Sequence, residues 1–206
     1  MHMKRRNVFL AGAIIEVLFL VIAVFTKTQF VKDCIFALAG IGLFYLIEQK
    51  FPLNPIVIVI GLLPFYIHSA GVLFGFFGAS MFGLGYDKWS HLINSLMFTI
   101  VAFYILIAHS RDRIVRGVIL AFLVMLGVNL LEEVNEFVGS RYFGFLDESI
   151  FSMGDALPPG ASDMQRYDTW WDMIFDIVGG LVAAAILGVI ILLEKHHYRR
   201  PVWHNQ

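Results

Sequence analysis

Six long apolar stretches run through this chain of 206 residues, and they constrain its fold more than any other feature. Each is close to the ~20 residues that an α-helix needs to cross the hydrocarbon core of a bilayer. Their predicted bounds are 8–25, 30–47, 55–77, 89–108, 114–137 and 172–193. Charged residues make up only 15% of the chain, whereas soluble domains carry about 25%. The sequence therefore predicts an all-α, polytopic membrane protein with a bundle of about six transmembrane helices.

The links between these stretches are short except for the fifth, 138–171, which we expect to form a long outer loop. Loops of this length often act as lids or binding loops. No linker is long or polar enough to separate two domains, so residues 1–206 are predicted to form a single transmembrane domain. The only cysteine, Cys34, excludes an intramolecular disulfide and a cysteine metal cluster.

Basic residues are distributed unevenly along the chain. With six spans the two termini share a side, and ten of the 15 Lys and Arg residues fall on that side. Because Lys and Arg favour the cytoplasmic side, we expect both termini to be cytoplasmic in a multi-pass protein of the inner (cytoplasmic) membrane. Twelve of the 16 Asp and Glu residues fall on the opposite, outer side. This acidic outer side would concentrate cations.

A stripe of carboxylates enters the last apolar stretch. Asp168, Asp172 and Asp176 are each four residues apart, and on a helix this spacing places them on one face, one turn above the next. Ionisable groups at membrane depth are costly and usually face the interior of a bundle or a wet cavity, where they mark function. The stripe therefore indicates a functional site.

The fourth and fifth apolar stretches carry polar residues near the same outer surface. Asp87, His91 and Asn94 form one polar stripe at the start of the fourth stretch, although Asp87 alone would also suit a helix cap. The fifth stretch ends with three glutamates, which need either a compensating cation or raised pKa values because negative charge is disfavoured at a helix C-terminus. They are Glu132, Glu133 and Glu136.

Two further ionisable residues lie deeper. Glu16, in the middle of the first stretch, suits either a hydrogen bond to a neighbouring helix or a proton or cation station. His68, in the third stretch, suits either a structural hydrogen bond or a proton shuttle or metal ligand. We expect His68 and Asp176 to form the floor of the site.

Three helices thus place acids or histidine within about two turns of the outer interface, at ~1.5 Å rise per residue. Mixed carboxylate and histidine ligands suit Zn²⁺, Mn²⁺ or Fe²⁺ better than Mg²⁺ or Ca²⁺, which prefer oxygen ligands alone. The predicted ligands of such a divalent metal are His91, Glu133, Glu136, Asp168 and Asp172. Further candidates are Asp87, Asp176, Glu132 and Glu16.

Three motifs together resemble the YjdF-type inner-membrane proteins, which look like relatives of the VanZ-like family. The motifs are Tyr86-Asp87-Lys88-Trp89-Ser90-His91, Glu133-Val134-Asn135-Glu136-Phe137 and Asp168-Thr169-Trp170-Trp171-Asp172-Met173 with Gly179 further on. Asp176 departs from the family pattern, which has a small apolar residue there. The resemblance implies a multi-helix membrane fold. It implies no settled activity, although VanZ-like proteins are associated with low-level glycopeptide resistance.

Three functions fit these residues. The first is a metal-dependent enzyme acting on a lipid or lipid-linked substrate at the outer leaflet, with Glu136 as general base on a metal-bound water and His68 as proton shuttle. The second is a proton- or cation-coupled transporter, in which Glu16, His68 and Asp176 form a relay. The third is a structural membrane protein whose polar cluster locks helices together. We expect membrane lipids as partners, a possible homo-oligomer and no nucleic acid.

Overall fold

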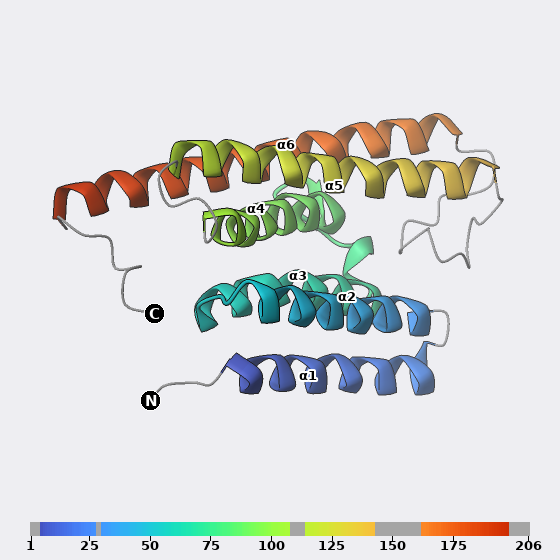
Figure 1. The fold of residues 1–206 in the computed structure, drawn as a ribbon. Coiled ribbons are helices and arrows are strands. Elements are labelled where there is room, and N and C mark those ends of the chain that lie inside the picture. Colours follow the sequence, from blue (N-terminus) through green and yellow to red (C-terminus); the bar gives the residue numbers. More distant parts are fainter. Residues whose placement is uncertain (1–4, 28–29, 108–113, 143–161, 198–206) are drawn as a thin grey trace.

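The computed structural model describes residues 5–27, 30–107, 114–142 and 162–197, and this part of the chain contains six long α-helices (Figure 1). They are α1 (Arg5–Thr26), α2 (Val31–Lys50), α3 (Pro55–Phe74), α4 (Tyr86–Ile107), α5 (Ile114–Tyr142) and α6 (Ser162–His197). A 3₁₀ turn, η2 (Phe76–Gly78), and a two-stranded hairpin, β1 (Ser80–Met81) with β2 (Leu84–Gly85), connect α3 to α4. The prediction of an all-α membrane bundle is confirmed.

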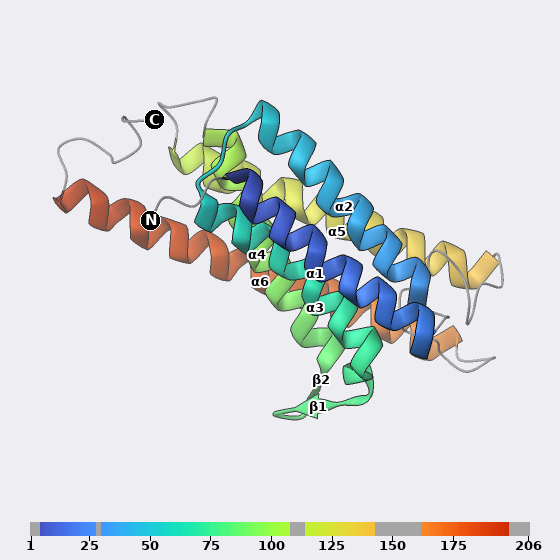
Figure 2. The same ribbon diagram turned by 90° about the horizontal axis from the view of Figure 1, so that it is seen from below.

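Among the described residues, five helical segments are long and apolar enough to cross a membrane: α1, α3, α4, Ile114–Val134 of α5 and Thr169–Leu193 of α6. α2 has 20 residues, but charged side chains lie near both of its ends. A sixth crossing by α2 therefore stays a prediction. α1 begins at Arg5 and α6 ends at His197, and these two helix ends lie at the same end of the bundle (Figures 1 and 2). The assignment of that end to the cytoplasm also stays a prediction.

The helix bounds differ from the prediction at most ends; for example, α1 begins at Arg5, α2 ends at Lys50 and α6 ends at His197, each three or four residues beyond the predicted span. The third helix ends at Phe74 instead of residue 77, because Gly75 adopts a left-handed φ of 74° and its N–H donates to the carbonyl of Gly71. The fourth begins at Tyr86, three residues early. The predicted outer loop 138–171 was wrong at both ends, since α5 continues to Tyr142 and α6 begins at Ser162; residues 143–161 lie outside the described part. Polar residues at helix ends resemble loop sequence, and this explains the error.

The hairpin after α3 was not predicted. Ser80 pairs with Gly85 and Met81 with Leu84, in antiparallel register. The two turn residues, Phe82 and Gly83, both have positive φ values, 55° and 78°, as a tight two-residue hairpin turn requires. Phenylalanine rarely adopts a positive φ, so the presence of Phe82 at the first turn position did not indicate a hairpin turn.

The helices form two groups of three that meet at the α3–α4 contact (Figure 1). In the first group α1 packs on α2 and α3, and in the second α4 packs on both α5 and α6. Near the start of α1, the buried Glu48 faces Arg5, with 3.6 Å between Oε1 and Nη1. α1 begins, and α2 ends, at the end of the bundle opposite the hairpin (Figure 2).

The left-handed cap of α3 gives a first testable prediction. We expect Gly75→Ala to lower the free energy of unfolding by about 1 to 2 kcal/mol, because a Cβ is strained at a positive φ. Thermal unfolding in detergent measures the effect. Gly85→Ala is the matched control, since no atom lies within 4 Å of the added Cβ. An equal loss of stability in both variants would contradict the role of the cap.

Candidate functional site

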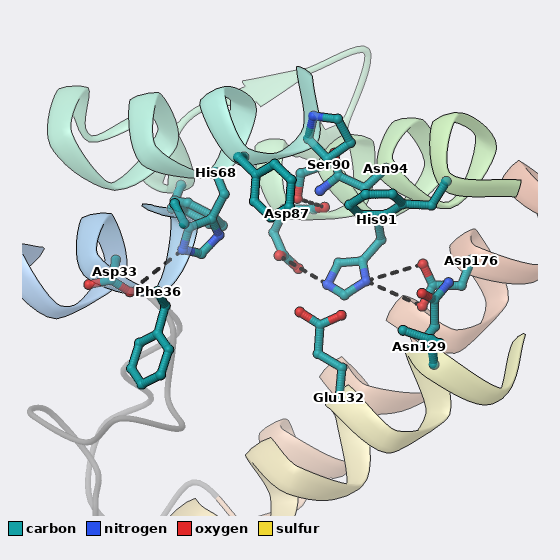
Figure 3. A pocket seen from close by; sticks show the side chains of 16 residues that line it. Asp33, Phe36, His68, Asp87, Ser90, His91, Asn94, Asn129, Glu132 and Asp176 are labelled. Atoms are coloured by element: carbon teal, nitrogen blue, oxygen red, sulfur yellow. Dashed lines mark hydrogen bonds and ion pairs between the residues drawn. The ribbon is translucent and has the colours of Figure 1, made fainter. Parts of the chain in front are cut away.

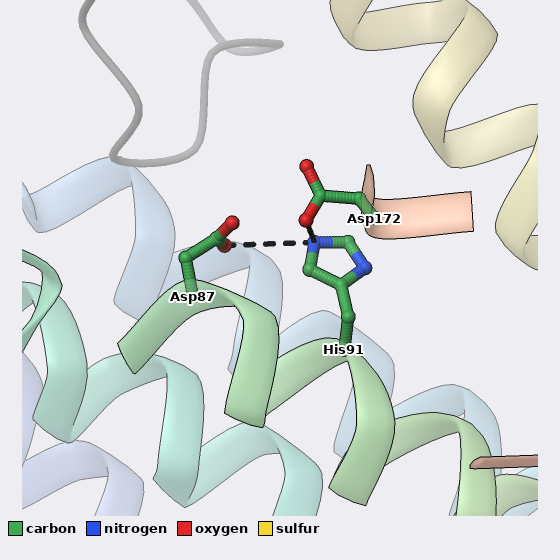
Figure 4. Close-up of side chains that lie close together, drawn as sticks. All are labelled: Asp87, His91 and Asp172. Carbon is green, nitrogen blue, oxygen red and sulfur yellow. Dashed lines mark ion pairs between the residues drawn. The ribbon is translucent and has the colours of Figure 1, made fainter. Parts of the chain in front are cut away.

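His91 lies at the centre of four carboxylates from three helices. On one side of the ring, Nε2 is 3.6 Å from Asp87 Oδ1 and 3.8 Å from Asp172 Oδ1 (Figure 4). On the other side, Nδ1 is 3.7 Å from Glu133 Oε1 and 3.4 Å from each carboxylate oxygen of Asp176. We call these five residues the His91 centre. All five are buried or half-buried.

Local helix geometry explains how these side chains meet. Asp87 and His91 are one turn apart on α4, and Asp172 and Asp176 are one turn apart on α6. Because α4 packs directly on α6, the two pairs face each other, and Glu133 reaches them from α5. Hydrogen bonds below the centre fix the packing: Asn129 Nδ2 donates to Ser95 Oγ, and Ser95 Oγ donates to the carbonyl of Asp176.

Lys88 neutralises part of this negative charge. Its Nζ lies 2.7 Å from Asp87 Oδ2 and 2.6 Å from Asp172 Oδ1, so it bridges α4 and α6. Only 15% of the Lys88 side chain is exposed. The positive charge between the two acids on the Nε2 side of His91 is therefore supplied by the Lys88 ammonium group.

Two overlapping sets of ligands could hold a metal ion among the described residues. They are Asp87, His91 and Asp172, and His91, Glu133 and Asp176. The first set already holds the Lys88 ammonium. In the second set Glu133 is 2% exposed, and its Oε1 has no hydrogen-bond partner in the described part of the chain. A buried carboxylate oxygen without a partner is costly, and a bound cation would remove that cost.

A cavity of about 200 Å³ adjoins the His91 centre (Figure 3). It lies between the two groups of helices, and side chains from α2, α3, α4, α5 and α6 line it. The carboxyl group of Glu132, an exposed residue of α5, points towards His91. His68 and Asp33 line the opposite wall, with 3.5 Å between His68 Nε2 and Asp33 Oδ1.

Beyond this wall, Glu16 is fully buried in α1. Its Oε1 accepts a hydrogen bond of 2.6 Å from Ser69 Oγ of α3, whereas Oε2 has no hydrogen-bond partner among the described residues. Glu16 therefore belongs to a second polar group, next to His68, and not to the His91 centre.

The sequence matches one family over most of its length. A family described as predicted membrane protein (DUF2238) matches residues 6–192. The chain belongs to this family. The resemblance to YjdF-type proteins agrees with it, whereas a relationship to VanZ-like proteins stays a prediction. No curated protein and no solved structure matches the chain.

The structure brings together three of the five predicted metal ligands: His91, Glu133 and Asp172. The other two, Glu136 and Asp168, lie on α5 and α6, but their side chains are outside the described part. The further candidates Asp87 and Asp176 belong to the centre, and Glu132 lines the cavity. Asp176 was expected at a deeper level with His68; instead it contacts the same ring as Asp172, because the imidazole is level with both turns of α6.

Sequence reasoning missed two residues of the site. Lys88 was counted as an outer charge and quoted within the Tyr86–His91 motif, but it was not named as a site residue, although this motif already set it at the polar start of the helix. Asp33 was likewise counted as an outer charge, but it is 2% exposed and faces the cavity. An acid just inside an apolar helix was the signal that could have found it.

Proposed function

We propose that this integral membrane protein binds one divalent transition-metal ion at His91, Glu133 and Asp176 and uses it to act on a lipid or lipid-linked substrate. The observation that carries the proposal is the buried Glu133 Oε1, which has no hydrogen-bond partner among the described residues and faces His91 Nδ1 at 3.7 Å. The cavity beside this set of ligands would receive the reacting part of the substrate.

The spacing of the ligand atoms supports a metal ion. Two ligands that each lie ~2.0–2.2 Å from a tetrahedral zinc ion are ~3.3–3.6 Å apart. His91 Nδ1 is 3.4 Å from Asp176 and 3.7 Å from Glu133. One imidazole and two carboxylates suit Zn²⁺, Mn²⁺ or Fe²⁺ better than Mg²⁺ or Ca²⁺. Three protein ligands also leave a position for water or substrate, as catalytic zinc sites do.

The chemistry that we propose is metal-assisted attack on a carbonyl or phosphoryl group. The ion would polarise the substrate oxygen or activate a water molecule. His68, which lines the cavity opposite His91, is the proposed proton shuttle, and its Nε2 lies 3.5 Å from Asp33 Oδ1. Glu136, three residues after Glu133 on α5, is the proposed general base on sequence position alone.

A proton- or cation-coupled transporter is the second candidate function. It is favoured by Glu16, which is fully buried in α1 with Oε2 lacking a hydrogen-bond partner in the described part. A transporter predicts that Glu16→Gln abolishes flux driven by pH or cations in liposomes. The enzyme predicts that the same variant retains metal and turnover, because Glu16 lies outside the His91 centre.

Metal content measured by mass spectrometry on detergent-purified protein tests the first proposal. We expect about one metal ion per chain in the wild type, and loss of it in Glu133→Gln and Asp176→Asn, because each removes an anionic ligand. Glu48→Gln is the matched control: it also replaces a buried glutamate, but at the opposite end of the bundle. Size-exclusion chromatography verifies that each variant is folded. Wild type without metal after incubation with Zn²⁺, Mn²⁺ and Fe²⁺ would overturn the proposal.

A further inference from the structure

We propose that the cavity binds a small organic cation, an amine or quaternary ammonium group, next to Asp33 and between phenylalanine rings. If this cation is the headgroup of the substrate, the inference rests on the proposed function above and gives the chemical class of that substrate. As a binding site, the cavity needs no metal, so the two proposals can be tested separately.

The charge of the cavity wall favours a cation. Four carboxylate residues line the cavity: Asp33, Asp87, Glu132 and Asp176. Two histidines line it as well, but within the described ranges no lysine or arginine does. A concave site with an excess of one sign of charge raises the local concentration of ligands of the opposite sign.

Of the four acids that line the cavity, Asp33 is the one with both carboxylate oxygens buried and open to a hydrogen bond or ion pair from a ligand. It is 2% exposed, and neither of its carboxylate oxygens has a hydrogen-bond partner among the described residues. Its nearest basic neighbour in this part of the chain is His68, whose Nε2 lies 3.5 Å away, beyond the range of a good hydrogen bond. A buried carboxylate in this situation is costly unless a charged partner is supplied. A ligand in the cavity can supply it.

Four phenylalanines also line the cavity: Phe36, Phe65, Phe77 and Phe98. Phe77 lies beside His68, with 6.0 Å between ring centroids, and Phe65 meets Phe98 edge to face at 5.9 Å. Aromatic faces attract cations, and cages of such rings recognise quaternary ammonium groups. A cavity lined by both carboxylates and phenylalanine rings therefore suits a nitrogen cation that carries carbon substituents.

The size of the cavity restricts the ligand further. Pockets for drug-sized ligands measure ~300–1,000 Å³. This cavity, at about 200 Å³, has room for a headgroup but not for acyl chains. Choline and ethanolamine groups fit this description. Their two possible sources are a lipid headgroup and the free amine.

Calorimetric titration of choline into protein treated with EDTA tests the cation site. The neutral isostere 3,3-dimethylbutanol has the same shape without the charge. We expect choline to bind at least ~10-fold more tightly than this alcohol, because both the carboxylate and the rings act on the charge. Asp33→Asn should remove most of this preference, and Phe77→Leu should reduce it. Glu48→Gln, a buried acid remote from the cavity, should leave it unchanged.

Equal affinity for choline and the alcohol, or an unchanged preference in a folded Asp33→Asn variant, would overturn the cation site. Choline binding in the EDTA-treated protein supports the site even if no metal is ever found. Nanodiscs distinguish the two sources. If phosphatidylcholine lipids suppress choline binding and phosphatidylglycerol lipids do not, the lipid headgroup is the occupant. If choline binds equally in both, the free amine is the occupant.

Discussion

Replacing Gly179 with valine should prevent the bundle from folding. Gly179 lies on α6 where this helix packs against α4, and a Cβ added there would overlap the carbonyl oxygen of Leu92 and lie 3.0 Å from its carbonyl carbon. These are backbone atoms, so no side-chain rotation can relieve the overlap. Overpacking costs ~1–3 kcal/mol even where side chains can adjust. The helices would have to separate, and the His91 centre with them, because His91 precedes Leu92 and Asp176 is close to Gly179.

Size-exclusion profiles and thermal unfolding in detergent measure this effect. Gly188→Val is the matched control, since it lies on the same helix and a Cβ there meets no atom within 4 Å. We expect the control to elute and unfold like the wild type. A Gly179→Val protein that is monodisperse and retains its unfolding temperature would show that α4 and α6 are not packed as described.

Much of the fold was predictable because apolar length and helix formation are local properties. Each of the six predicted stretches overlaps one of the helices α1 to α6. The continuation of α6 to Ser162 was not predictable in this way, because its first turns are polar and hydropathy does not separate them from a loop. Gly179 was noted as part of a motif, but the reason for it is the close approach of α4, and this depends on tertiary packing.

The site was predictable along each helix but not between helices. Spacings of four residues placed Asp87 with His91 on one helix face and Asp172 with Asp176 on another. In the structure, all three aspartates lie beside the imidazole of His91. Which side of the imidazole each acid meets depends on how α4, α5 and α6 cross. The pairing of Asp33 with His68 likewise depends on the contact of α2 with α3, for which the sequence carries no local signal.

In the metal site that we propose, replacing Lys88 with methionine should allow a second metal ion to bind at the His91 centre. Lys88 Nζ now lies between Asp87 Oδ2 and Asp172 Oδ1, at 2.7 and 2.6 Å. Without it, a set of three ligands remains, since both acids also face His91 Nε2 at 3.6 and 3.8 Å. In the absence of metal we expect a loss of about 3–5 kcal/mol, the usual cost of removing one partner of a buried ion pair. Added Zn²⁺ or Mn²⁺ should restore stability by replacing the ammonium charge.

Metal content and thermal unfolding, each with and without added metal, test this expectation. Lys50→Met is the matched control, because Lys50 is exposed at the end of α2. The control should keep the metal content and stability of the wild type. One ion in the wild type and still one in a folded Lys88→Met protein would show that the ammonium does not hold a metal position. Two ions in the variant would identify Lys88 as the residue that limits the proposed centre to one ion, and His91 would then bridge the two ions as an imidazolate, with its ring N–H proton released to solvent.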